Sequence, residues 1–408
     1  MLFLQVVVIL IVAKSVGALL KKAGQPEVIG EMMAGFILGP IVLGYFFPDF
    51  HRALFRGAAE LQLKVLSDLG ILLFMFVVGA EFRFPERKRH GPRHGVLLIG
   101  TCSILVPWVL GAATAPLLYQ AFAPHDAPTL GFTLFIATVF SVTAFPVLAR
   151  ILKERRMIDS EQGGVVLASA ALSDIGVWIM LAIIALSMQI EGRWQDLAWR
   201  LLGLVALCVM SFAVVRPLFK AWLTRVGPNA PYLLLVLVCG ALIYASITDW
   251  LQVHSVFGAF LFGACLPRDQ RLLNMLVERV EHLAVVVLMP SFFALAGLNT
   301  SLDAFSGVGI GLLALVLLVA LAGKLLGAGI GARVAGYPLD QSLRIGVLMN
   351  ARGLMELVVL KIGMDLGLID DRLFTLFVIM TVATTMMTGP LLTLLDRQAA
   401  NRRLAGTP

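Results

Sequence analysis

The chain has 408 residues, of which 59% are hydrophobic and only 14% are charged. Soluble domains carry about 25% charged residues, so this composition excludes a soluble globular protein. The net charge of +7 does not indicate nucleic-acid binding, because the lysines and arginines lie in short loops between apolar stretches, where such charges set membrane topology. We expect no nucleic-acid partner and no cofactor.

Apolar stretches predict an all-α polytopic membrane protein with thirteen transmembrane helices. In chain order, the predicted spans cover residues 2–20, 27–47, 61–80, 94–120, 129–149, 162–190, 197–220, 231–249, 253–267, 276–298, 305–332, 342–364 and 372–395. Residues 1–398 then form one membrane domain, followed by a short cytoplasmic tail at 399–408.

The basic residues gather in alternate loops, as at 87–89 and 153–156, and the loops between them are poor in lysine and arginine. Short loops rich in lysine and arginine stay in the cytoplasm. This pattern predicts an outside N-terminus, a cytoplasmic C-terminus and a multi-pass protein of the cell membrane, in bacteria the inner membrane.

Two segments, 28–40 and 256–267, repeat one pattern of apolar residues, with two equally spaced glycines and a closing proline. The second and ninth spans contain these segments, and spans seven apart cross the membrane in opposite directions. The pattern therefore predicts an inverted repeat, in which the substrate site lies at mid-membrane between the halves. Alternatively, the small residues only let helices pack closely.

The fifth and twelfth spans, which correspond under this repeat, both contain helix-breaking sequence. Pro146 removes a backbone donor from the fifth span. The twelfth span contains Asn350, Arg352 and Glu356, which are poorly suited to lipid exposure. We expect two broken helices that cross and face one another. Arg352 and Glu356, four residues apart, alternatively pair only with each other.

The sixth span has a single charged side chain between Glu161 and Glu191, namely Asp174. A carboxylate at mid-bilayer costs about 2.5–3.5 kcal/mol and usually lines an ion or proton pathway. Burial favours the protonated form of a carboxylate, so a proton and a cation can compete for it. The alternative is a carboxylate that pairs with a neighbouring helix and has no transport role.

Four segments together resemble the cation:proton antiporter-2 family, and the resemblance covers nearly the whole chain. They are Ser-Val-Thr-Ala-Phe-Pro-Val-Leu-Ala-Arg-Ile-Leu at 141–152, Ser-Asp at 173–174, Gly-Lys at 323–324 and Asn-Ala-Arg-Gly-Leu-Met-Glu-Leu at 350–357. The family includes bacterial potassium-efflux antiporters, plant cation/proton exchangers and bacterial sodium/proton antiporters.

The resemblance implies the sodium/proton antiporter fold, with a transport core at about 61–190 and 276–395 and dimerisation helices at about 1–47 and 197–267. It implies that Asp174 binds the ion and that Lys324 is the core lysine that pairs with acidic residues near the site in electrogenic members. Relatives commonly have Asp, Asn or Gln where this chain has Ser173. The nucleotide-binding domain of potassium-efflux members is not expected here.

We therefore expect a homodimeric secondary antiporter, not an enzyme, that exchanges Na⁺ or K⁺ for protons by alternating access and serves pH homeostasis. The monovalent cation would bind at Asp174, with Ser173 and Thr143 as further oxygen ligands. Lys324 would pair with Asp174 in the empty state, or with Glu356 as a structural pair. With one carboxylate at the site, exchange should be electroneutral. Alternatives are a sodium-coupled organic-solute symporter, a channel and a non-transporting sensor.

Overall fold

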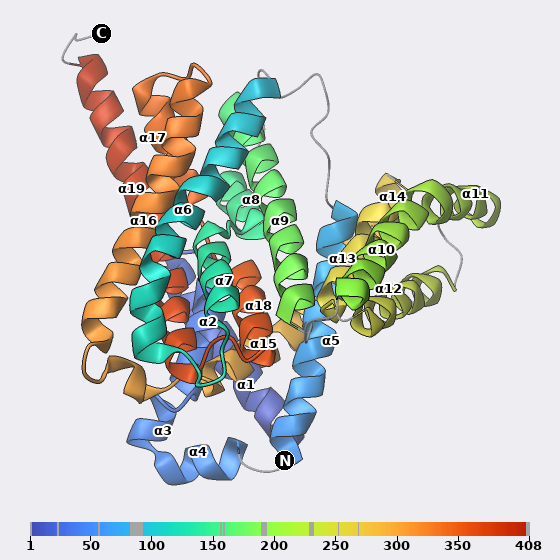
Figure 1. Ribbon diagram of the computed structural model, residues 1–408, viewed down its shortest axis with the longest axis horizontal. Coiled ribbons are helices and arrows are strands. Elements are labelled where there is room, and N and C mark those ends of the chain that lie inside the picture. Colours follow the sequence, from blue (N-terminus) through green and yellow to red (C-terminus); the bar gives the residue numbers. More distant parts are fainter. Residues whose placement is uncertain are drawn as a thin grey trace. The chain divides into compact units, whose positions relative to one another are not determined.

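The computed structural model describes residues 2–22, 24–55, 58–81, 93–155, 157, 160–188, 194–227, 232–251, 253–267 and 269–404. Regular structure in these ranges is helical (Figure 1). Eleven of the described segments are long and apolar enough to cross a membrane. The shorter α13 (Ser255–Cys265) and the pair α17 (Leu339–Met349) and α18 (Leu354–Asp365) complete the thirteen predicted spans. The predicted fold class is confirmed.

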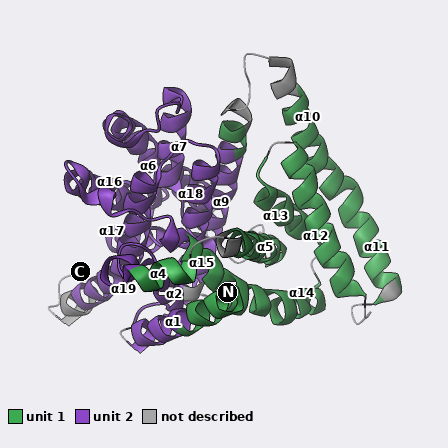
Figure 2. Ribbon diagram, turned by 90° about the horizontal axis from the view of Figure 1, so that it is seen from below, with its two compact units in different colours: residues 1–11, 49–83, 182–295 green, residues 12–48, 84–181, 296–408 purple. Residues whose placement is uncertain are grey.

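The chain divides into two compact units (Figure 2). Unit 1 comprises Met1–Ile11, Asp49–Arg83 and Ala182–Leu295. Besides α13 and the first half of α1 (Leu2–Lys22), it contains the helices α4 (Pro48–Phe55), α5 (Ala58–Glu81), α10 (Trp194–Met210), α11 (Arg216–Val226), α12 (Leu233–Trp250), α14 (Gln270–Leu276) and most of α15 (Met289–Leu298). Three π-helical turns, at Ser211–Val215, Val277–Glu281 and Ala284–Leu288, connect α10 to α11 and α14 to α15.

Unit 2 comprises Val12–Pro48, Phe84–Leu181 and Ala296–Pro408. Its helices are the rest of α1, then α2 (Glu27–Leu38), α3 (Leu43–Phe46), α6 (Arg93–Phe122), α7 (Thr129–Ser141), α8 (Phe145–Glu154), most of α9 (Glu161–Met188), α16 (Gly309–Val334), α17, α18 and α19 (Asp371–Leu404), with a 3-10 turn at Leu302–Phe305. Residues 399–404 of the predicted tail continue α19, and 405–408 lie outside the described residues. The division into transport core and dimerisation helices stays a prediction.

Both predicted helix breaks are confirmed. The fifth span stops at Ser141 and resumes at Phe145 as α8. Pro146 lies in the first turn of α8, where its missing N–H removes no intrahelical bond. The same missing N–H leaves no donor for the carbonyl of Val142, which weakens the helix at this point.

The second break, between α17 and α18, depends on Gly353. Its φ of +157° lies in a region that residues with a Cβ rarely adopt. A Cβ on Gly353 would also lie 2.9 Å from Cγ2 of Val147 on α8. The glycine therefore lets the chain turn out of α17 and lets the two breaks approach one another.

The two glycine-rich segments have equivalent surroundings in the two units. A Cβ on Gly30 of α2 would meet α1 at Gly17, and one on Gly258 of α13 would meet α12 at Tyr244. The later glycine of α2 packs against α15, and that of α13 packs against α5. Span two therefore contacts spans one and ten in the same way as span nine contacts spans eight and three. This correspondence is what an inverted repeat predicts, and it shows that the glycines also serve close packing.

In unit 2, α16 packs on α6 through glycines spaced four apart. A Cβ on Gly327 would lie 2.6 Å from the carbonyl oxygen of Cys102, and one on Gly331 would lie 2.7 Å from that of Leu98. One turn earlier, a Cβ on Gly323 would lie 2.9 Å from Cβ of Pro107. This glycine stripe brings the two backbones close together and places the next residue, Lys324, beside α6.

Candidate functional site

The two helix breaks cross within unit 2 and are joined by a backbone hydrogen bond. The N–H of Ala144, between α7 and α8, donates to the carbonyl of Ala351, between α17 and α18, at 3.0 Å. Residues 142–144 and 351–353 lie outside the helices. Half-helix ends therefore meet here, with the carboxyl end of α7 carrying partial negative charge and the amino end of α8 partial positive charge.

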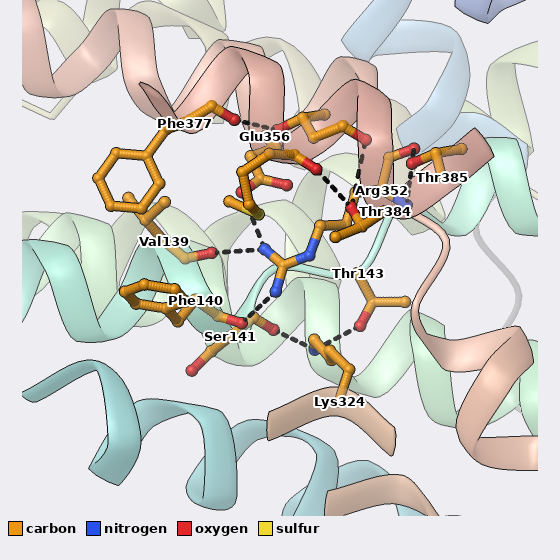
Figure 3. Close-up of polar contacts among 12 residues, drawn as sticks. Val139, Phe140, Ser141, Thr143, Lys324, Arg352, Glu356, Phe377, Thr384 and Thr385 are labelled. Atoms are coloured by element: carbon orange, nitrogen blue, oxygen red, sulfur yellow. Dashed lines mark hydrogen bonds and ion pairs between the residues drawn. The ribbon is translucent and has the colours of Figure 1, made fainter. Parts of the chain in front are cut away.

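Arg352 neutralises the carboxyl end of α7 (Figure 3). Its guanidinium donates to the carbonyls of Val139 at 3.1 Å and Phe140 at 2.7 Å. It also forms an ion pair with Glu356 at 2.8 Å, and both side chains are fully buried. The expected contact of Arg352 with the facing helix end is therefore present, and the alternative that Arg352 and Glu356 pair only with each other is wrong, because the planar guanidinium reaches both partners together.

Lys324 binds the last carbonyl of the same helix end (Figure 3). From α16 its ammonium donates to the carbonyl of Ser141 at 2.5 Å and the hydroxyl of Thr143 at 2.6 Å. On α6 it donates to the carbonyl of Ser103 at 3.0 Å and the hydroxyl of the same residue at 3.3 Å. All four acceptors are uncharged. In the described residues Lys324 forms an ion pair neither with Asp174 nor with Glu356, so both predicted pairings of this lysine are absent here.

The second break is fastened to α19. The side-chain amide of Asn350 donates to the carbonyl of Thr384 at 3.0 Å. The backbone N–H of Arg352 donates to the hydroxyl of Thr385 at 3.0 Å, and that hydroxyl donates to the carbonyl of Arg352 at 2.8 Å. Unwound backbone inside a membrane must be satisfied by protein, and Thr385 supplies those bonds to Arg352.

Asp174 lies at the amino end of α8. The backbone N–H of Phe145, the first residue of that helix, acts on its carboxylate, and only 5% of the residue is exposed. A helix amino end stabilises negative charge. Lys324 is near enough to act on Asp174 electrostatically without contacting it. The only charged side chain of the sixth span therefore sits at the crossing.

Two uncharged, buried side-chain oxygens of predicted site residues remain without a hydrogen bond to the described part of the chain. They are Oγ of Ser173, which precedes Asp174, and Oδ1 of Asn350, at the end of α17. A buried polar atom without a partner is costly. Neutral oxygens of this kind are suitable ligands for a hard monovalent cation.

The structure thus places all predicted site residues at or beside the crossing. Hydrogen bonds connect Thr143, Lys324, Arg352 and Glu356 to the two breaks. Pro146 shapes the break itself. Their roles in transport stay predictions.

Sequence reasoning missed three residues that hold this site, namely Ser103, Thr384 and Thr385. Two signals were present in the sequence. Ser103 lies four residues before Pro107, which leaves its carbonyl without a helical donor. The last apolar span has a run of threonines at 381, 384, 385 and 388, spaced to lie on one helix face.

Comparison with known proteins identifies relatives of the whole chain. The family model described as "Sodium/hydrogen exchanger, transmembrane" matches residues 7–395. The Na(+)/H(+) antiporter NhaS4 of Synechocystis is 34% identical over 394 residues, which are 95% of both chains. Cation/H(+) antiporter 17 of Arabidopsis thaliana is 37% identical over 399 residues, 96% of this chain and 48% of the relative. The K(+)/H(+) antiporter 1 of Saccharomyces cerevisiae is 33% identical over 378 residues, which are 90% of this chain and 43% of the relative.

The chain thus spans about half the length of its plant relative. Among solved structures, the sodium proton antiporter MjNhaP1 from Methanocaldococcus jannaschii matches with a TM-score of 0.61 at 15% identity, covering 97% of this chain and 98% of that one. This match supports the antiporter fold. The protein is a multi-pass membrane protein, and its chain belongs to the sodium/hydrogen exchanger family.

Proposed function

We propose that the protein is a secondary antiporter that exchanges a monovalent cation, Na⁺ or K⁺, for protons across the membrane by alternating access. The observation that carries this proposal is the position of Asp174, a buried carboxylate at the crossing that has no ion-pair partner among the described residues. A carboxylate held by a counter-charge would resist both ligands, whereas this one can take a proton or a cation.

The neighbouring oxygens support a cation site at Asp174. The buried hydroxyl oxygen of Ser173, the residue before Asp174, has no hydrogen bond to the described residues, and the hydroxyl of Thr143 accepts a hydrogen bond from the ammonium group of Lys324. In this proposal the protonated and the cation-loaded carboxylate both cross the barrier, while the empty anion does not, because moving an uncompensated charge is costly. The result is obligatory exchange.

The names of the relatives support both ions, since one is a Na(+)/H(+) antiporter and another a K(+)/H(+) antiporter. One carboxylate trades one proton for one cation, so we propose electroneutral exchange, unless Lys324 also releases a proton. Flux measured in liposomes at several clamped membrane potentials tests this point, and a steep voltage dependence that disappears in Lys324→Gln would contradict it.

The deciding experiment uses proteoliposomes with an imposed pH gradient and a fluorescent pH probe. Addition of Na⁺, K⁺ or Li⁺ singly should dissipate the gradient for at least one ion, and choline should not. No response to any of these ions would contradict the proposal. Sodium-dependent uptake of a labelled organic solute that leaves the pH gradient intact would instead support the symporter alternative.

We also propose a homodimer in the cell membrane, in bacteria the inner membrane, with the N-terminus outside and the C-terminus cytoplasmic. The basic loops support this orientation through the positive-inside rule. Cysteine accessibility at positions 3 and 402 in intact cells tests the orientation, and light scattering of the detergent-purified protein tests the dimer.

A further inference from the structure

Lys324 has an acceptor that lies outside the crossing, on α6. The carbonyl and hydroxyl of Ser103, at 3.0 and 3.3 Å, are two of the four acceptors that share the three N–H donors of its ammonium group. Ser103, like Lys324, is completely buried. A carbonyl in the middle of a helix normally accepts the N–H four residues later, so its availability to a side chain needs a cause.

Pro107 is that cause. It lies four residues after Ser103 inside α6 and has no N–H, so it cannot donate to the carbonyl of Ser103. Inside a membrane no water replaces a missing donor, and an unsatisfied carbonyl costs several kcal/mol. The proline therefore creates a strong acceptor at a fixed place on the buried face of α6.

Gly323 brings the lysine to this acceptor. A Cβ at this position would lie 2.9 Å from Cβ and 3.0 Å from Cα of Pro107, so only glycine lets α16 come this close. Lys324 follows directly in the sequence. Pro107 thus leaves the Ser103 carbonyl free to accept a hydrogen bond, and Gly323 lets α16 pack closely enough for the Lys324 ammonium group to reach it.

This arrangement holds the lysine away from the carboxylate that it would otherwise pair with. The ammonium acts electrostatically on Asp174, yet its four hydrogen bonds go to neutral oxygens. An ion pair with Asp174 and the bonds to Ser103 are competing positions for one ammonium group. Removing the Ser103 carbonyl from this competition should favour the ion pair.

We propose that Ser103 and Pro107 are positioning residues that dock Lys324 on α6, so that Asp174 stays accessible to the transported cation. The proposal rests on the antiporter function proposed above and adds a determinant of its cation affinity. When the dock is lost, Lys324 moves toward Asp174 and competes with the cation. When Lys324 is replaced, Ser103 and Pro107 have no ammonium group to hold, so changing them should not alter the cation affinity.

The test is Pro107→Ala, measured as cation-driven proton flux in proteoliposomes. Alanine supplies an N–H that donates to the Ser103 carbonyl, so the apparent KM for the cation should rise about tenfold, the scale of one hydrogen bond to a charged group. The matched control is Pro116→Ala, which changes the other internal proline of α6 at an exposed position. It should leave KM unchanged. Equal KM values for both variants would overturn the proposal.

A double substitution separates positioning from a general effect on the fold. In a Lys324→Gln background, adding Pro107→Ala should leave KM where Lys324→Gln alone puts it. A rise of the same size as in the wild-type background would show that the proline acts through helix shape and would overturn the proposal.

Thermal melting of the four purified proteins without added cation gives a second readout that needs no transport. The shifts from Pro107→Ala and Lys324→Gln should be non-additive, because the two residues serve one interaction. Additive shifts in melting temperature would overturn the proposal that Pro107 positions Lys324. If the wild-type protein moves protons with no cation, the antiporter proposal is wrong. The melting temperatures of the four proteins still show whether Pro107 and Lys324 serve one interaction.

Discussion

The two helix breaks differ in where their charges come from. The α7–α8 break has no charged residue of its own, and side chains of other helices serve it: Lys324 and Arg352 at its carbonyl end and Asp174 at its amino end. The α17–α18 break carries its own Arg352, which forms a buried ion pair with Glu356 in the first turn of α18.

This difference indicates that the two breaks have different roles. At the first break, Lys324 and Asp174 lie close together without an ion pair, so each can change partners. At the second, the carboxylate is neutralised at 2.8 Å and the backbone is fastened to α19 by Thr385. We infer that ion exchange belongs to the first break and that the second fixes its geometry. The predictions below test this division, beginning with the largest effect.

Asp174→Asn should reduce exchange more than a hundredfold and leave the melting temperature close to that of the wild type. The substitution keeps the size of the side chain and removes the charge for which cation and proton compete. Proteoliposome flux and thermal melting in detergent measure the two quantities. Wild-type flux in this variant would show that the carboxylate is dispensable, and the proposed site would then be wrong.

Glu356→Gln should mainly affect stability. It should lower the free energy of unfolding by about 3–5 kcal/mol, because it leaves the buried Arg352 without its counter-charge. The double variant Arg352→Gln with Glu356→Gln should recover part of this loss, since no unpaired charge remains. Melting of the purified variants measures both. A stable Glu356→Gln protein would mean that the helix end of α7 suffices to neutralise Arg352.

The charge-reversed pair, Arg352→Glu with Glu356→Arg, separates the two contacts of Arg352. If the ion pair were its only task, reversal would restore stability. The structure predicts no such rescue, because a carboxylate at position 352 would face the carbonyls of Val139 and Phe140. Melting equal to the wild type would therefore contradict the role of Arg352 at the end of α7.

The sequence was sufficient to predict the thirteen spans and both breaks, because apolar length, Pro146 and the polar cluster at 350–356 are local signals. It predicted which residues meet at the crossing through the resemblance, and it anticipated the Arg352–Glu356 pair from helical spacing. It did not predict the partners of Lys324. Several acceptors lie within reach of a lysine, and the choice among them depends on how closely α16 packs on α6.

Gly353→Ala tests the backbone of the second break and should cost about 1–3 kcal/mol, the usual cost of a residue held in a rarely allowed conformation. The alanine must adopt the φ of +157° and also displace Val147. Gly311→Ala is the control, because that helical position has open space around it and should be neutral or slightly stabilising. Equal melting temperatures for the two variants would mean that the break relaxes without cost.

The smallest expected effect concerns the hydroxyl of Thr385, which bonds the N–H and the carbonyl of Arg352. Thr385→Val keeps the shape and removes both bonds, and interhelical hydrogen bonds in membrane proteins contribute about 0.6 kcal/mol on average and up to about 1.7. Two such bonds to unwound backbone should bring the loss to about 1 kcal/mol. Thr388→Val is the matched control, because among the described residues that buried hydroxyl bonds only the preceding turn of its own helix, at Thr384. If both valine variants melt alike, the hydroxyl of Thr385 does not fasten the second break, and the rigidity that we assign to this break must come from the Asn350–Thr384 bond and the Arg352–Glu356 pair.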